Sequence, residues 1–145
     1  MTREATVERN TKETKIAIKL NLDGTGKSSL DTGVGFFDHM LDGFTRHGLF
    51  DLDIKVKGDL QVDDHHTIED TGIVLGTAIK EAVGDKKGIR RYGSCILPMD
   101  ECLVLCAIDL GGRPYLSFEG EFTSEKIGDM STEMAVSYTH LRAHE

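Results

Sequence analysis

The sequence has no tryptophan, two prolines and three cysteines, and it contains no long apolar run. Because a membrane-spanning helix needs about 20 mostly apolar residues, none is predicted. The odd number of cysteines, without metal-type C-x-x-C spacing, argues against a disulfide framework and favours a reducing compartment. The charged segment 1–9 lacks the apolar stretch of a secretory signal, so we expect a cytoplasmic protein. We expect all three thiols to be buried; they are Cys95, Cys102 and Cys106.

Basic residues are too scattered to form a surface for nucleic acid. The formal net charge is −8, and the longest basic clusters are Lys86-Lys87 and Arg90-Arg91. Binding to a phosphate backbone needs clustered lysine and arginine, so we expect no nucleic-acid partner, and no membrane partner either. A chain of 145 residues is long enough for one domain with a core and too short for two.

Alternation of apolar and polar residues predicts strands near the N-terminus. From Lys15 to Asp23 the side chains alternate, which is typical of a strand with one buried face. The segment 23–26 predicts a turn, and we expect residues 27–31 to return as an antiparallel partner. Gly26-Lys27-Ser28 resembles the end of a phosphate-binding loop, but Asn21 replaces the first glycine of that motif and no helical pattern follows directly.

Two segments have the apolar spacing of helices. Residues 36–44 predict a short helix that carries His39 and, near its end, His47. The stripe within residues 65–83 predicts the main helix, with Gly84 as its C-cap. We expect further strands at 52–56, 94–98, 102–110 and 116–122, and another helix opening at 131–133. Strands clustered around few helices indicate an α+β fold, with an antiparallel or mixed sheet and helices packed on one face.

The main helix begins with two adjacent histidines and a carboxylate. Residues four apart share a helix face, so His65 and Glu69 are placed to bind one metal ion together. His66 points about 100° away from His65. This spacing predicts two metal ions, and imidazole with carboxylate suits manganese, iron, zinc, cobalt or nickel. Asp63 or Asp64 is expected to cap the helix or to hold a histidine ring. The alternative is a charged helix start in which the histidines bond only to aspartates.

Five motifs follow one another along the chain: Gly35-Phe36-Phe37-Asp38-His39-Met40-Leu41, His65-His66-Thr67-Ile68-Glu69-Asp70, Arg90-Arg91-Tyr92-Gly93, Met99-Asp100-Glu101 and Asp109-Leu110-Gly111-Gly112-Arg113-Pro114. Together they resemble the imidazoleglycerol-phosphate dehydratase family of histidine biosynthesis. The resemblance runs from about Ala5 to Glu133. It implies a pseudo-duplicated domain of two halves, of the ribosomal-protein-S5-domain-2-like type, with the second half incomplete in this chain.

The resemblance also implies the reaction, which is the dehydration of imidazole-glycerol phosphate to imidazole-acetol phosphate by a hydro-lyase. Two Mn²⁺ ions per site bind the two nitrogens of the substrate's imidazole ring and stabilise an imidazolate, from which hydroxide leaves. One ion is implied at His65 and Glu69. The other is implied at His39 and His66.

Further residues of this chain match family positions that contact the small phosphate substrate. Glu13 is the implied acid or base and also binds substrate. Arg91 and Arg113 match positions that hold the phosphate, which suits the geometry of guanidinium groups. His47 is implied to line the site, and Asp100 to orient the substrate hydroxyls.

The sequence departs from the family after Glu133, because a second His-His-x-x-Glu and a further isolated histidine are missing. We therefore expect one dehydratase-like domain over residues 1–133, with a complete first half and a partial second half, and a foreign tail over residues 134–145. The family assembles as a 24-subunit shell with active sites at the interfaces, so self-association is implied. We expect poor solubility, weak manganese binding and little activity from this chain as written.

Two other functions stay open at this point. A non-catalytic metal-binding or assembly domain of the same fold predicts metal uptake without turnover. A phosphoryl-transfer enzyme that uses Gly26-Lys27-Ser28 predicts nucleotide binding that depends on Lys27.

Overall fold

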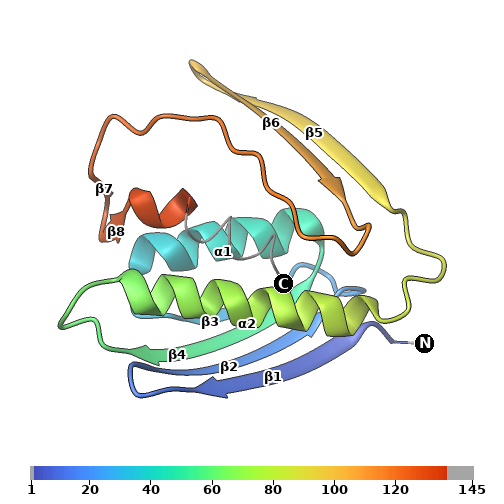
Figure 1. The fold of residues 1–145 in the computed structure, drawn as a ribbon, viewed down its shortest axis with the longest axis horizontal. Helices are drawn as coiled ribbons and strands as arrows, with labels where there is room; N and C mark the ends of the chain where they lie inside the picture. The colour runs from blue at the N-terminus through green and yellow to red at the C-terminus, as the bar shows by residue number, and fades with distance from the viewer. Residues whose placement is uncertain (1, 137–145) are drawn as a thin grey trace.

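A four-stranded sheet with two helices on one face forms the body of the molecule (Figure 1). The computed structural model describes residues 2–136. In the sheet the strands lie in the order β1 (Glu4–Asn10), β2 (Thr14–Asn21), β4 (Asp51–Gly58) and β3 (Ser28–Asp31). The helices are α1 (Gly35–Gly48) and α2 (His65–Val83), and Gly84 is the C-cap of α2. The expected α+β fold with helices on one face is confirmed.

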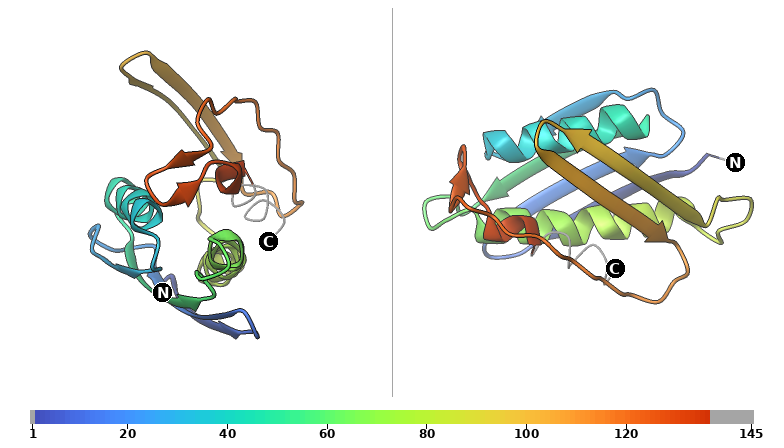
Figure 2. Two further views of the ribbon diagram at one scale, coloured as in Figure 1. Left: turned by 90° about the vertical axis from the view of Figure 1, so that its left-hand side faces the viewer. Right: turned by 90° about the horizontal axis from the view of Figure 1, so that it is seen from above.

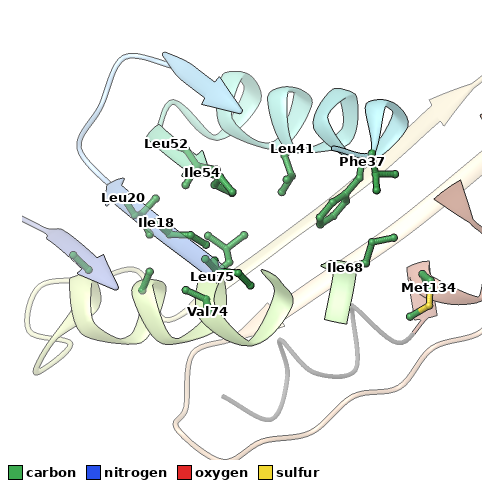
Figure 3. Close-up of a cluster of buried hydrophobic side chains, with 14 of the residues drawn as sticks. Ile18, Leu20, Phe37, Leu41, Leu52, Ile54, Ile68, Val74, Leu75 and Met134 are labelled. Atoms are coloured by element: carbon green, nitrogen blue, oxygen red, sulfur yellow. The ribbon is translucent and has the colours of Figure 1, made fainter. Parts of the chain in front are cut away.

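The apolar residues that alternate along the predicted strands, and those on one face of the predicted helices, form the core between the sheet and the helices (Figure 3). In β2 the side chains of Ile16, Ile18 and Leu20 are buried, and every second residue between them faces outward. Along α2 the stripe predicted from the sequence packs on them, with Ile68 and Leu75 fully buried. Burial of this apolar surface is what holds α2, and therefore its first turn, against the sheet.

Strand β3 runs parallel to β4 rather than antiparallel to β2, so the predicted pairing of residues 27–31 is wrong. Strand β4 occupies the position beside β2, and β3 lies beyond it. The Asp51 carboxylate fixes this arrangement, because its Oδ1 accepts hydrogen bonds from the backbone N–H groups of Thr25 (2.9 Å) and Lys27 (3.0 Å). Since Lys27 leads into a strand and not a helix, the phosphate-binding loop is also excluded.

A β-hairpin lies on the far side of the helices from the four-stranded sheet (Figure 2). It consists of β5 (Tyr92–Met99) and β6 (Cys102–Asp109), joined by the turn Asp100-Glu101. Every residue of both strands is exposed. The predicted burial of Cys95, Cys102 and Cys106 is therefore wrong, because within residues 2–136 no element covers either face of the hairpin.

The strand predicted at residues 116–122 is absent, and the segment is irregular. Among residues 2–136 no strand pairs with its backbone, and the rings of Phe118 and Phe122 stack on each other at 6.4 Å between centroids. Two short strands follow, β7 (Lys126–Ile127) and β8 (Met130–Ser131). The helix expected after Ser131 begins at 133–136, and the rest of that expectation lies outside the described residues. No helix of the described part is both long and apolar enough to cross a membrane.

Candidate functional site

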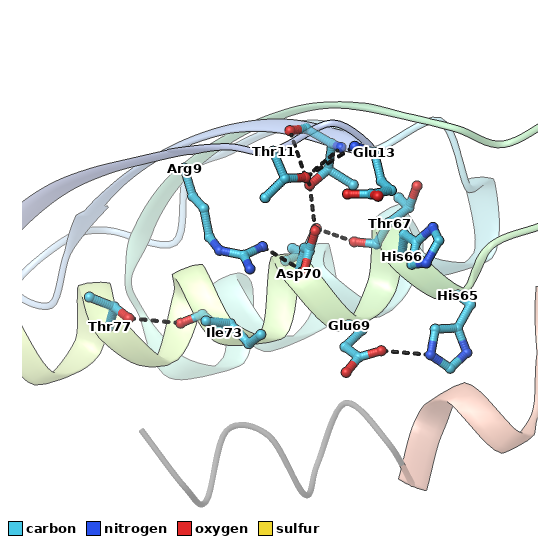
Figure 4. A network of polar contacts seen from close by, with 12 residues as sticks. Arg9, Thr11, Glu13, His65, His66, Thr67, Glu69, Asp70, Ile73 and Thr77 are labelled. Atoms are coloured by element: carbon cyan, nitrogen blue, oxygen red, sulfur yellow. Dashed lines mark hydrogen bonds and ion pairs between the residues drawn. The ribbon is translucent and has the colours of Figure 1, made fainter.

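The first turn of α2 presents His65 and Glu69 on the same face, as their spacing predicts. His65 Nε2 lies 2.6 Å from Glu69 Oε2, and both side chains are partly exposed (Figure 4). Helical geometry holds the two groups together without help from any other element. The nitrogen and the oxygen converge on one region at the surface, which suits a shared cation.

His66 points in a different direction and has a different partner. The two histidine rings are nearly perpendicular, at 87°. The Nδ1 atom of His66 lies 2.8 Å from Oδ2 of Asp59, which directly follows β4. A carboxylate that accepts from Nδ1–H fixes the tautomer and leaves Nε2 available as a ligand.

The charges around His66 favour its protonated form in the absence of metal. The hydrogen bond to Asp59 raises the pKa of His66; burial opposes this rise, and the negative charges of Asp59, Glu13 and Asp63 add to it. Glu13 on the β1–β2 turn therefore lies near His66, as Figure 4 also shows. A bound cation would replace the proton as the compensating charge.

The two aspartates before α2, Asp63 and Asp64, were each expected either to cap the helix or to hold a histidine ring. Asp63 accepts a hydrogen bond from the backbone N–H of His65 at 2.9 Å, so it caps the helix start. Asp64 instead binds Ser131, and the residue that holds a histidine ring is Asp59. Asp59 was missed because it lies outside the helix, and its only sequence signal is its place three residues after the predicted strand at 52–56.

A partly buried polar network joins α2 to the turn that carries Glu13. Asp70 accepts a hydrogen bond from Thr14 Oγ1 at 2.5 Å and forms an ion pair with Arg9 at 2.6 Å. The hydroxyl of Thr11 accepts hydrogen bonds from the backbone N–H groups of Glu13 and Thr14. These contacts, drawn in Figure 4, fix the β1–β2 turn relative to the first turns of α2.

His39 lies on the first turns of α1, and α1 and α2 begin at the same end of the molecule (Figure 1). Its ring is exposed and lies 6.1 Å from the ring of Phe36. Within residues 2–136, no three histidine, cysteine, aspartate or glutamate side chains lie close enough together to hold a metal ion. The described part of one chain thus supplies metal-ligand side chains in pairs, such as His65 with Glu69, and no complete set of ligands for one ion.

The two arginines expected at the phosphate lie elsewhere, at the base of the β5–β6 hairpin. Arg91 makes a two-pronged ion pair with Asp109, at 2.7 and 3.2 Å. This hydrogen bonding lowers the pKa of Asp109, and the positive charges of Arg91, Arg113 and Lys86 lower it further against the effect of burial. Arg113 therefore lies near Arg91, and the structure brings these two predicted residues together.

The hairpin base and the histidines lie at opposite ends of α2. Helix α2, which lies between them, has 19 residues and is therefore roughly 27 Å long at 1.5 Å per residue. His47 lies two turns after His39, near the C-terminal end of α1. Asp100 lies at the tip of the hairpin, roughly 23 Å along the strands from its base. One chain therefore presents the predicted site residues as separate groups.

Comparison with known proteins gives a consistent result. The sequence model of a family described as imidazoleglycerol-phosphate dehydratase matches residues 32–143. The chain is 61% identical to the imidazoleglycerol-phosphate dehydratase of Lachnoclostridium phytofermentans, over 96% of this chain and 74% of that protein. It is also 61% identical to the dehydratase of Acetivibrio thermocellus, over 95% of this chain and 71% of the relative.

Solved structures agree with these sequence relatives. The crystal structure of imidazoleglycerol-phosphate dehydratase from Staphylococcus aureus superposes with a TM-score of 0.85 at 38% identity, covering 97% of this chain and 77% of the other. The structure from Pyrococcus furiosus, in complex with (S)-C348, superposes with a TM-score of 0.78 at 30% identity, covering 94% and 72%.

Proposed function

Because the chain belongs to the imidazoleglycerol-phosphate dehydratase family, whose members are lyases of histidine biosynthesis, we propose how its residues carry out the reaction. The substrate is imidazole-glycerol phosphate, and the product is imidazole-acetol phosphate. Two manganese ions are held by the first turns of α2 and α1, and the complete site draws on more than one copy of the chain. The cytoplasm is the proposed compartment.

The donor set at the start of α2 fits manganese. His65 and Glu69 offer one nitrogen and one oxygen that converge within 2.6 Å of each other, and His66 offers Nε2 because Asp59 occupies Nδ1. We assign His39 to the same ion as His66. Bound manganese would supply Lewis acidity at the two nitrogens of the substrate's imidazole ring.

Glu13 is the proposed acid or base. It lies on the β1–β2 turn, near His66, and the Asp70 network fixes that turn relative to α2. A carboxylate next to the ring-binding residues is placed to take a proton from a substrate carbon and to return it. Asp100 and His47 are the proposed contacts to the substrate hydroxyls and to the rest of the substrate.

The phosphate is assigned to Arg91 and Arg113. The substrate spans about 8 Å from its ring to its phosphorus, by bond lengths of about 1.5 Å. This is far shorter than the roughly 27 Å between the hairpin base and the histidines of one chain. One substrate molecule therefore meets the histidines of one copy and the arginines of another, which supports interfacial sites in a homo-oligomer.

The observation that carries the proposal is the convergence of His65 and Glu69, and a matched pair of variants tests it. Glu69→Gln is expected to weaken Mn²⁺ binding by more than about 100-fold, because it removes a charged ligand. Glu81→Gln changes an exposed glutamate near the other end of α2 and is expected to bind like the unsubstituted chain. Calorimetric titration with Mn²⁺ measures both.

Turnover is measured on the same proteins as formation of imidazole-acetol phosphate, with Mn²⁺ and with chelator. We expect the low activity of this chain to require Mn²⁺ and to be lost in Glu69→Gln. Metal uptake without any turnover would instead favour the non-catalytic metal-binding domain. Unchanged Mn²⁺ affinity in Glu69→Gln would refute the ligand assignment.

A further inference from the structure

Helix α1 takes its N-terminal cap from a residue far away in the sequence. Val34, which precedes the helix, makes no side-chain capping hydrogen bond. Instead the carboxylate of Asp129 accepts hydrogen bonds from the backbone N–H groups of Gly35 (2.6 Å) and Phe36 (2.9 Å). These two N–H groups have no partner within the helix, and a carboxylate suits the positive end of its dipole.

Two residues later, the same segment contacts the start of α2. The backbone N–H of Ser131 donates to Asp64 Oδ2 at 2.6 Å, and the Ser131 hydroxyl donates to Oδ1 at 2.9 Å. Asp64 is the N-cap residue of α2 but makes no side-chain hydrogen bond to that helix. Its carboxylate instead ties α2 to the segment that caps α1.

Buried methionines anchor this segment in the core. Met130 and Met134 are 7% and 1% exposed, and Figure 3 shows Met134 at the same end of the core as Phe37 and Ile68. Gly128 has a φ of +59°, and a Cβ there would lie 3.3 Å from the Phe36 side chain. The turn between β7 and β8 therefore approaches α1 closely, in a backbone conformation that favours glycine.

We propose that the segment 129–131 is a clamp that sets the position of the start of α1 relative to the start of α2. His39 lies one turn into α1 from the capped residues, and His65 directly follows Asp64. The clamp therefore positions His39 relative to His65 and His66. Asp129, Ser131 and Asp64 act through the helices as positioning residues. The effect on metal binding rests on the proposed function, whereas the effect on helix position does not.

The clamp predicts effects that cross from one helix to the other. Asp129→Asn touches only α1 directly, and Ser131→Ala touches only α2. In metal-free protein, well below the unfolding temperature, we expect Asp129→Asn to shift the imidazole NMR signals of His65 and His66 as well as His39. We expect Ser131→Ala to shift His39 as well as His65. Asp53→Asn, on β4, is the control and should leave all three unchanged.

A second measurement follows the same variants with Mn²⁺. Each clamp variant is expected to lose about 10-fold in affinity, as for residues that orient metal ligands. Shifts confined to the helix that each substitution touches would overturn the clamp and leave only local capping. A third outcome is that each substitution shifts histidine signals on both helices, but the unsubstituted protein binds no Mn²⁺. That outcome would support the clamp and refute the proposed function. Ser131→Ala keeps the backbone hydrogen bond, so it tests the clamp even where Asp129→Asn does not fold.

Discussion

The orientation of His66 depends on a carboxylate from another element. Asp59 holds Nδ1, and its second oxygen is buried without a hydrogen-bond partner among the described residues. Among residues 2–136, the His66 ring is therefore the hydrogen-bond partner of this carboxylate. A residue that orients a metal ligand in this way contributes substantially to the affinity for the metal.

Asp59→Asn is therefore expected to lower Mn²⁺ affinity by about 10–100-fold while all the proposed ligands remain. Asp53→Asn, which changes an aspartate on β4 itself, is the matched control. Titration of both variants with Mn²⁺ is the measurement. Equal affinities in the two variants would show that Asp59 has no role in the site.

The same substitution has a pH signature in metal-free protein. The folded pKa of His66 is raised above its unfolded value of about 6.5, chiefly by Asp59. The stabilisation is therefore complete below the unfolded pKa and is lost as pH rises through the folded pKa. Thermal unfolding should find Asp59→Asn less stable than the unsubstituted chain at pH 5, with a smaller difference at pH 9. A difference that is constant with pH would contradict this.

At the level of single residues, sequence reasoning found the groups whose relation is local. The i,i+4 spacing of His65 and Glu69 fixes their contact within one helix, so no tertiary information is needed. Asp59 and Asp129 act across 7 and more than 90 residues, respectively. Their contacts arise from how strands and helices pack, and nothing in their local sequence marks them.

Strand β4 and helix α2 lie in close contact at Gly58 and Thr67. A Cβ added to Gly58 would overlap Thr67 Oγ1, which is buried and has no hydrogen-bond partner within residues 2–136. Glycine at this position lets the first turn of α2 lie directly on the end of β4. The position of His66, next to Thr67, depends on this contact.

We expect Gly58→Ala to destabilise the fold by about 1–3 kcal/mol through overpacking. Thr67→Ala in the same chain should restore much of the loss, because it removes the overlapping atoms. The control is Gly43→Ala in α1, where an added Cβ meets nothing within 4 Å and better helix propensity should stabilise by up to about 1 kcal/mol. Urea unfolding measures these three variants and Thr67→Ala alone. Additive losses in the double variant would show that the two residues do not interact.

Among the elements, the alternation of residues predicts which face of a strand is buried but not which strand lies beside it. The buried faces of β2 and β4 follow the pattern, yet β3 pairs with β4, since the hydrogen bonds of Asp51 carry the loop past β2. Residues 116–122 show the converse case. Leu116, Phe118 and Phe122 have a strand-like pattern, but a strand exists only where another backbone completes its hydrogen bonds.

For the molecule as a whole, the apolar composition of the β5–β6 hairpin predicts that it is buried, but no other described residues cover it. The β5–β6 hairpin is rich in apolar residues, and Ile96, Leu103 and Leu105 are each more than 60% exposed. A contiguous apolar surface of this kind is typical of an interaction site. The hairpin base also carries Arg91 and Arg113, which places the proposed phosphate-binding groups beside this surface.

A site shared between copies makes a quantitative prediction for mixed assemblies. His65→Ala disables the metal half of a site, and Arg113→Ala disables the phosphate half; each variant alone should be inactive. If the halves come from different copies, random assembly of equal amounts gives two intact halves in about a quarter of the sites. Co-expression of the two variants should therefore recover about a quarter of the activity of the unsubstituted chain.

The matched control is co-expression of His65→Ala with Glu69→Gln, which damage the same half. Every site in that mixture lacks a ligand of the same ion, so no recovery is expected. Equal activity in the two mixtures would mean that the arginines and the histidines do not come from different copies. In that case the roughly 27 Å between them in one chain would have to close by a rearrangement of the hairpin. Recovery in the first mixture alone requires no such movement, because each copy then contributes its histidines to one site and its hairpin arginines to another.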